Sequence, residues 1–474
     1  MRVFHLSAEC YPVAKVGGLA DVVGSLPKYQ NRLGCVASVI MPWYDVDFVN
    51  KNTFENIFDG KVVLRNHQYP FKVLKETKNQ LGFELFLIKI EGLTDRQSVY
   101  GYEDAAKQFI GFQTVALYFM RESEIQPDLV HCHDHHTGLI PFMMNYVPEF
   151  EKLRGIPTVG TIHNGQYQGQ MGWEMLNYLP GFNLSDSGLL DWNNIINPLA
   201  AMVKCTHAFT TVSEGYLNEL MNEKGAGLES LYRQESQKAY GLVNGIDTEV
   251  WNPETDEFLV ENYGSNNFVS KKKANKKVLY ERYKLNKELP LVAFIGRFAA
   301  EKGADLLPGI IQRMIMERSG DVNFFVLGSG NLEVEQKLLD VQHRFIGNFG
   351  LETGYNEALS HLIYAGADFL LMPSRVEPCG LNQMYAMRYG SIPIVRKTGG
   401  LNDTVPDIEE KNGRGFQFND ADETGACWAI HKALDFMSNT KESRKLRRKI
   451  MKIDFSWEKS AQKYLALYKT IKQR

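Results

Sequence analysis

The chain has 474 residues, of which 44% are apolar and 23% charged, and its formal net charge is −3. This length fits two or three domains and excludes a single small module. The composition excludes a disordered protein, because the chain has enough apolar residues to bury a large core. A nearly balanced charge offers no electrostatic footprint for nucleic acid or for an anionic membrane. We therefore expect no nucleic-acid and no membrane partner.

The cysteines and the N-terminus indicate the compartment. The six cysteines lie far apart in the sequence and form no C-x-x-C pair, unlike the cysteines of a disulfide scaffold. The first residues lack the charged and apolar regions of a secretory signal. No apolar run reaches the ~20 residues that span a bilayer. These features predict a cytoplasmic protein with reduced thiols.

Short apolar runs alternate along the chain with amphipathic helical stretches, which is typical of βαβ units around a parallel sheet. The first block of buried strands is expected at Arg2–Leu6, Ala37–Met41, Leu129–His131, Thr158–Thr161 and Phe209–Val212. An antiparallel excursion is expected at Val62–Leu64, Phe71–Leu74 and Glu84–Ile88. A second series is expected at Leu291–Ile295, Asn323–Leu327, Phe369–Met372, Ile392–Val395 and Gly415–Phe418. The sequence therefore predicts an α/β protein with two Rossmann-like blocks.

The two blocks are expected to join near Asn244–Asp247, because a turn-rich stretch unsuited to a core element follows there. A long helix with one apolar stripe is expected to begin near Ser456.

One short motif occurs twice. Residues 15–23 (KVGGLADVV) and 397–405 (KTGGLNDTV) match at six of nine positions, and each precedes an expected helix. Glycines at a strand-to-helix turn permit positive φ and close backbone approach, so that amides at the helix N-terminus can hold an anion. Tight packing alone is the alternative for either copy. The presence of the motif in both blocks favours anion binding.

Charged residues follow two expected strands of the second block. Arg297 and Lys302 come after the first of them, at the edge where such sheets bind ligands, and could clamp a diphosphate. A surface ion-pair cluster is the alternative. Glu377 comes after Phe369–Met372 and could bond sugar hydroxyls or offset positive charge developing on a sugar ring. Its alternative role is a helix N-cap.

Residues 131–138 (HCHDHHTG) crowd four histidines and an aspartate together, which raises the question of a metal. We interpret them as the end of a buried strand followed by a helix-capping Asp134, because adjacent strand side chains point to opposite faces. We expect no metal and no cofactor. His163 ends another strand and could donate a hydrogen bond to a hydroxyl near a reacting carbon; a satisfied core histidine is the alternative.

Together these motifs resemble the bacterial glycogen synthases and plant starch synthases, glycosyltransferase family 5, which have the GT-B fold. The resemblance extends from Leu6 to about Trp457, and it is carried by residues 15–22 (KVGGLADV), 133–134 (HD), 161–164 (TIHN), 243–247 (VNGID), 296–303 (GRFAAEKG), 377–381 (EPCGL) and 396–401 (RKTGGL). Tyr385 stands where the wider class of retaining GT-B enzymes often has a second glutamate. This difference disfavours sucrose-phosphate-type enzymes and general mannosyl- or glucosyltransferases.

The resemblance implies two Rossmann-like domains that face an interdomain cleft. The implied domains are an acceptor-side domain (1–243), a nucleotide-sugar-binding domain (244–456) and a C-terminal helix (457–474) that packs back on the first. The implied reaction is retaining transfer of glucose from ADP-glucose, or UDP-glucose, to the non-reducing end of an α-1,4-glucan. No carboxylate is evident as a nucleophile on the far face of the sugar, so we expect same-face displacement with cations stabilising the leaving diphosphate.

The resemblance also implies site residues. The catalytic set is Glu377, His163, Arg297, Lys302 and Asp134. The donor-binding set is Lys15, Gly17, Gly18, Asp21, Asn244, Arg297, Lys302, Tyr355, Cys379, Gly380, Leu381, Thr398, Gly399 and Gly400. Within it, Tyr355 would stack on the base, and the amides around Thr398–Leu401 would hold the diphosphate and the sugar. The stretch from Tyr100 to Asp104, in contrast, looks shortened relative to the family.

Two alternatives remain open. One is a related GT-B transferase with a different donor or acceptor. The other is an inert glucan-binding regulator, which the joint presence of Lys15, Arg297, Lys302 and Glu377 disfavours, because binding a glucan needs no diphosphate clamp. Neither the oligomeric state nor the natural acceptor follows from the sequence.

Overall fold

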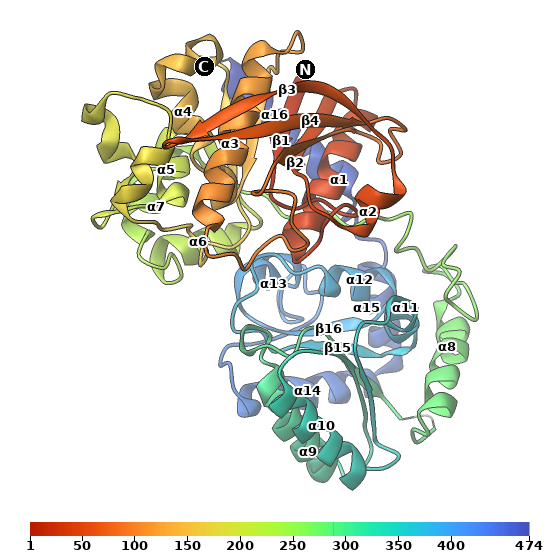
Figure 1. Cartoon of the computed structure of the whole chain (residues 1–474). Coiled ribbons are helices and arrows are strands. Elements are labelled where there is room, and N and C mark those ends of the chain that lie inside the picture. The colour runs from red at the N-terminus through yellow and green to blue at the C-terminus, as the bar shows by residue number, and fades with distance from the viewer. Residues whose placement is uncertain (288, 474) are drawn as a thin grey trace. The chain divides into compact units, whose positions relative to one another are not determined.

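The computed structural model describes residues 1–287 and 289–473, and the chain forms two compact α/β units (Figure 1). Unit 1 comprises Met1–Val243 together with the C-terminal segment that begins at Trp457, and unit 2 comprises Asn244–Ser456. All six cysteines are free thiols. Within the described part of the chain, no helix is both long and apolar enough to cross a membrane.

Unit 1 is built on a nine-stranded sheet in the order β11-β10-β7-β6-β1-β2-β5-β4-β3. Every pairing from β11 to β5 is parallel, and β4 pairs antiparallel with both β5 and β3. Its strands are β1 (Arg2–Leu6), β2 (Val36–Pro42), β3 (Phe54–Leu64), β4 (His67–Glu76), β5 (Glu84–Ile90), β6 (Leu129–His133), β7 (Thr158–Ile162), β10 (Ala208–Thr211) and β11 (Ala239–Gly241). A separate two-stranded sheet consists of β8 (Asp191–Trp192) and β9 (Ile195–Ile196). The expected excursion is antiparallel, and its last strand also joins the parallel sheet beside β2.

The helices of unit 1 are α1 (Gly18–Arg32), α2 (Asp47–Lys51), α3 (Ala105–Glu122), α4 (Ile140–Tyr146), α5 (Pro198–Cys205), α6 (Glu214–Asn222), α7 (Glu229–Gln234) and α16 (Trp457–Lys472). The last of these lies against α1, although the two helices are the farthest apart in the sequence. Trp457, Tyr464 and Tyr468 share a buried cluster with Val3 and Leu26. The C-terminal helix is therefore part of the core of unit 1.

Unit 2 is built on a six-stranded parallel sheet in the order β14-β13-β12-β15-β16-β17. Its strands are β12 (Leu291–Ile295), β13 (Asn323–Gly328), β14 (Phe349–Thr353), β15 (Phe369–Met372), β16 (Ile392–Arg396) and β17 (Phe416–Phe418). Its helices are α8 (Phe268–Arg282), α9 (Leu307–Glu317), α10 (Leu332–Arg344), α11 (Glu357–Gly366), α12 (Asn382–Arg388), α13 (Gly399–Thr404), α14 (Glu423–Ser438) and α15 (Thr440–Ile450). Among the described strands of unit 2, only β14 was not expected from the sequence; in unit 1, β8, β9 and β11 were not expected either.

Among the parallel strands of each of the two large sheets, the strand order reverses at one point. In unit 1 this point lies between β1 and β6, and in unit 2 it lies between β12 and β15. Open α/β sheets bind ligands beyond the carboxyl ends of the strands at such a switch point. The loops that follow these four strands are therefore where functional side chains should be sought.

Candidate functional site

An ion pair occupies the switch point of unit 2. Lys302, in the loop after β12, places its Nζ 2.6 Å from Oε2 of Glu377, in the loop after β15. Glu377 is only 5% exposed, and Ser374 Oγ donates to the same carboxylate oxygen at 3.1 Å. A buried carboxylate is costly without such partners. These two residues therefore hold the Glu377 charge in place beneath the loop surface.

Glu377 has no capping role. The helix that follows it, α12, begins at Asn382, and its N-cap residue Leu381 makes no side-chain cap. The carboxylate instead points to Lys302.

Arg297 differs from Lys302 in its surroundings. Its side chain is 70% exposed, and its Nη2 lies 2.6 Å from Oε1 of Glu301. This is the surface ion pair that the sequence left as the alternative for both cations. Exposed pairs of this kind contribute little to stability, so Arg297 can leave Glu301 at small cost.

The second glycine turn packs tightly against the Glu377 loop. Gly399 has a φ of 43°, and a Cβ there would lie 2.2 Å from the carbonyl oxygen of Glu377. A Cβ on Gly400 would lie 2.2 Å from the carbonyl oxygen of Cys379. The Gly400 amide donates to Glu377 O at 3.0 Å, and the Leu401 amide donates to Thr398 O at 3.0 Å. These two amides are engaged within the protein, contrary to the expectation that they hold a diphosphate.

The remaining residues expected in unit 2 lie on neighbouring loops. Burial raises the pKa of the Cys379 thiol to about 12, and the backbone of Asn244 hydrogen-bonds to that thiol. Gly380 has a φ of 72° just before Leu381. Tyr355, in the loop between β14 and α11, is 85% exposed, and its hydroxyl donates to Glu357 at 3.1 Å. Such exposure leaves the ring face of Tyr355 accessible to solvent.

Tyr385, in α12, belongs to an aromatic stack whose other members come from other parts of unit 2. Its ring is stacked on Trp251 with centroids 4.0 Å apart, and Trp251 is stacked on His361 at 3.9 Å. His361 bonds through Nδ1 to Oδ2 of Asp256 at 2.7 Å. The position where related transferases carry a second glutamate therefore serves packing in this chain.

In unit 1, a buried carboxylate that the sequence analysis missed organises the first glycine turn. Glu9, three residues after β1 and 3% exposed, accepts hydrogen bonds from the amides of Val16 and Gly17 at 2.6 and 2.9 Å. Its other oxygen accepts from the Tyr100 hydroxyl at 2.6 Å. Burial and the nearby Glu9 charge raise the pKa of Tyr100. Glu9 thus links the glycine turn to the segment that looks shortened in the sequence.

The first glycine turn, unlike the second, is open. A Cβ on Gly17 or on Gly18 would meet no atom within 4 Å, and neither residue has a positive φ. Only Gly399, of the four glycines in the two motifs, uses the left-handed region. Lys15 beside this turn pairs with Asp21, with Nζ 2.7 Å from Oδ1, and both side chains are partly exposed. Nothing in the packing around Gly17 and Gly18 requires glycine.

Asp134 and His163 join the ends of β6 and β7. Asp134 has a φ of 55°, and its Oδ1 accepts from the His163 amide at 2.7 Å. It makes no side-chain cap on the short helix His135–Thr137, so the expected capping role is wrong: the side chain turns to the neighbouring strand end instead. Burial raises the pKa of Asp134 to about 7.

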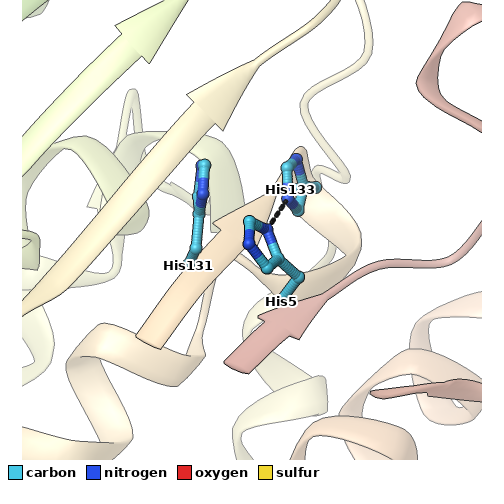
Figure 2. A group of neighbouring side chains, drawn as sticks. All are labelled: His5, His131 and His133. Atoms are coloured by element: carbon cyan, nitrogen blue, oxygen red, sulfur yellow. Dashed lines mark hydrogen bonds between the residues drawn. The ribbon is translucent and has the colours of Figure 1, made fainter. Parts of the chain in front are cut away.

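Three histidines lie together in the sheet of unit 1. The side-chain nitrogens of His5, His131 and His133 lie within 4.8 Å of one another, which is a spacing that a metal could use (Figure 2). Their ring nitrogens, however, all have protein partners: His5 bonds to His133 and Gln30, His131 to Tyr468 and Thr161, and His133 to His5 and His163. No lone pair is therefore left over for an ion, and the three rings do not fit a metal site.

Both units of the chain are similar to known proteins. Residues 2–234 match the model of the starch synthase catalytic domain, and residues 275–451 match that of the glycosyl transferases group 1. The chain is 48% identical over 474 residues to the glycogen synthase of Flavobacterium johnsoniae, with all of both chains covered. It is 36% identical to that of Thermodesulfovibrio yellowstonii, with 99% of this chain and 97% of the relative covered.

Solved structures agree with these matches. The catalytic domain of starch synthase IV from Arabidopsis thaliana, bound to ADP and acarbose, superposes with a TM-score of 0.88 at 33% identity, covering 100% of this chain and 99% of that one. Sucrose-phosphate synthase from Thermosynechococcus elongatus shares the fold, with a TM-score of 0.63 at 15% identity over 99% of this chain and 98% of that one. Both units thus have the GT-B type of architecture. The chain belongs to the glycogen synthase and starch synthase family of glycosyltransferases.

Proposed function

We propose that the protein transfers glucose from ADP-glucose to the non-reducing end of an α-1,4-glucan with retention of configuration. The observation that carries this proposal is the Lys302–Glu377 ion pair at the switch point of unit 2. A cation and a buried carboxylate in contact suit a substrate whose leaving group is anionic and whose sugar ring becomes positive. The related starch synthase IV domain is bound to ADP and acarbose, which supports this donor and this type of acceptor.

The residues of unit 2 would act on the nucleotide sugar. Lys302 would turn from Glu377 to the diphosphate, and Arg297 would leave its exposed pair with Glu301 to complete the clamp. Glu377 would then lie against the glucose and stabilise positive charge on the ring. We assign to Gly399 and Gly400 the task of fixing the Glu377 loop, with Thr398, Asn244, Cys379, Gly380 and Leu381 bordering the same loops, and to the exposed ring of Tyr355 the stacking of the base.

The residues of unit 1 would act on the sugar end of the reaction. The open turn at Gly17 and Gly18 leaves room for a ligand to approach the backbone, with Lys15 and Asp21 beside it. Asp134 and His163 would contact sugar hydroxyls. Displacement would occur on one face of the sugar, and the cations would offset the charge of the departing diphosphate, which is the largest part of the barrier.

Incubation of the protein with glycogen and radiolabelled ADP-glucose tests this proposal, with UDP-glucose run in parallel. We expect ADP-glucose to introduce label into the polymer. An enzyme that cuts only α-1,4 bonds should then release this label. Faster incorporation from UDP-glucose would show that the donor is wrong. Absence of label from both donors would refute the synthase function. The six free thiols support the cytoplasm as the place of this reaction.

A further inference from the structure

A continuous chain of hydrogen bonds runs through the core of unit 1 and ends at His163. Its seven bonds measure 2.6, 2.6, 2.6, 3.2, 2.8, 3.1 and 3.0 Å. In order, they connect Thr210, Thr161, His131, Tyr468, Gln30, His5, His133 and His163. Seven of these residues are buried, and His163 at the end is half-buried. The chain therefore leads from the core to a residue at the proposed site.

The four histidine side chains in this chain of hydrogen bonds are neutral. Burial lowers the pKa of His5 to about 4 and that of His163 to about 3. Burial and the neighbouring rings also hold the pKa values of His131 and His133 well below their usual range. A neutral imidazole has one N–H and one lone pair. When both nitrogens of a ring are hydrogen-bonded, one must donate and the other must accept, so each ring passes the direction of the bonding to the next.

Gln30 fixes the direction of this chain of hydrogen bonds, because its donor and its acceptor are two different atoms that face different neighbours. Its amide nitrogen can only donate and its carbonyl oxygen can only accept. Nε2 of Gln30 donates to the Tyr468 hydroxyl at 3.2 Å, and Oε1 lies 2.8 Å from Nε2 of His5. The His5 Nε2 must therefore carry the hydrogen and donate it to Gln30.

The remaining directions follow from this one. With its hydrogen on Nε2, His5 accepts through Nδ1 from Nε2 of His133, which is the bond drawn in Figure 2. His133 then accepts through Nδ1 from Nε2 of His163. His163 is left with a lone pair on Nδ1, for which the described residues provide no hydrogen-bond partner.

We propose that Gln30 is a positioning residue that sets the tautomer of His163, so that this ring presents Nδ1 as a hydrogen-bond acceptor. This inference rests on the proposed function, under which the partner of Nδ1 would be a hydroxyl of the glucose or of the glucan. A sugar hydroxyl can give a hydrogen to a lone pair, whereas an ionised diphosphate has none to give. His163 would thus favour the sugar over the diphosphate. The sequence suggested the opposite direction, with His163 as the donor.

Nitrogen NMR of the ligand-free protein, labelled with ¹⁵N only in histidine, tests this proposal without any substrate. Protonated and unprotonated ring nitrogens differ widely in chemical shift, and a His163→Gln spectrum identifies the signals of His163. We expect His163 to be protonated at Nε2 and bare at Nδ1. A hydrogen on Nδ1 in the wild-type protein would overturn the proposal. This spectrum is independent of the incorporation assay, so failure of the proposal is distinguishable from failure of the proposed function.

The variant Gln30→Met tests the role of the amide, because methionine keeps the length of the side chain and removes both strong hydrogen-bonding atoms. We expect Nδ1-protonated His163 to appear and kcat to fall about tenfold, as is typical when a residue that orients a functional histidine is lost. The matched control is Gln113→Met: Gln113 is also buried in unit 1, donates to Phe109 O and accepts from the Leu139 amide.

The control should lose similar stability and keep the His163 tautomer and nearly the wild-type kcat. An unchanged tautomer in Gln30→Met, or the same loss of kcat in both variants, would show that Gln30 is merely structural. Should Gln30→Met fail to fold, the wild-type spectrum alone still decides whether the tautomer is the proposed one.

Discussion

Replacing glycine by alanine should have opposite effects on the stability of the protein in the two glycine turns. At Gly18 a new Cβ would meet no atom within 4 Å, and the residue is the first of α1 with no positive φ. Replacing glycine by alanine in such a place stabilises a protein by about 0.4–1 kcal/mol. At Gly400 the Cβ would lie 2.2 Å from Cys379 O and 2.5 Å from Cys379 Cα. Both of these are backbone atoms, so Gly400→Ala should destabilise the fold by about 1–3 kcal/mol or more.

Activity should depend on these two sites in a different way. If a ligand approaches the backbone at Gly18, the methyl group of Gly18→Ala would occupy its place. We expect kcat/KM to fall by about 10², a loss that a misplacement of the bound group by about 1 Å can cause. Gly17→Ala should behave similarly, because its Cβ would also meet open space.

Thermal unfolding and glucose incorporation, measured on the same preparations, separate the two effects. Gly181→Ala is the matched control, since Gly181 also has no positive φ and no neighbour within 4 Å of a Cβ. It should keep both its stability and its activity. A Gly18→Ala enzyme with the wild-type rate would show that the open turn is not a ligand cradle. Unfolding of Gly18→Ala at a lower temperature than wild type would show that Gly18 is closely packed.

Three further predictions concern charge. Glu377→Gln should lower kcat by about 10²–10³ while leaving inhibition by ADP intact, since Lys302 is then free of its partner; a kcat within about threefold of wild type would return Glu377 to a structural role. Arg297→Ala and Lys302→Ala should each cost about 2–4 kcal/mol of transition-state stabilisation, and the double variant should cost less than the sum, because both cations act on one leaving group; strict additivity would contradict a shared clamp. Asp134 has a pKa of about 7 in the fold against 3.8 as the reference, so its penalty on stability is absent below pH 3.8 and grows as the pH rises towards 7. Urea unfolding should therefore find that Asp134→Asn exceeds wild type in stability by a larger margin at pH 8 than at pH 5, and equal differences at both pH values would contradict burial of the charge.

Much of the sheet was predictable because its strands are apolar on both faces. β15, for example, is a continuous run of buried apolar residues, and β1 is buried after Arg2; the sequence located both with their observed bounds. β14 was missed because Gly350 interrupts its apolar pattern; the ring of Phe325 lies against that glycine, where a Cβ would be 2.7 Å from it. The long strand β3 is mostly exposed, so only its buried end near Val62 gave a signal.

The site was harder to predict because its contacts join distant parts of the chain. Lys302 and Glu377 were each singled out, but their ion pair spans 75 positions that no spacing rule connects. Glu9 lies in a short loop without a local pattern, and its role depends on amides and a hydroxyl that the fold brings to it. The direction of hydrogen bonding at His163 depends on Gln30, which looks like an ordinary residue of an amphipathic helix.

The path of the chain makes unit 2 an insertion into unit 1. The ends of unit 2 are tied together, since the Ile246 amide donates to Phe455 O at 2.8 Å. The edges of the interruption in unit 1 are tied as well, since Ser460 Oγ donates to Val243 O at 2.8 Å. A gene encoding only Asn244–Ser456 should therefore yield a self-contained product, and a short linker from Val243 to Trp457 should close the remainder without strain. The same two junctions are natural places to open the chain for circular permutation, or to exchange unit 2 with that of a relative.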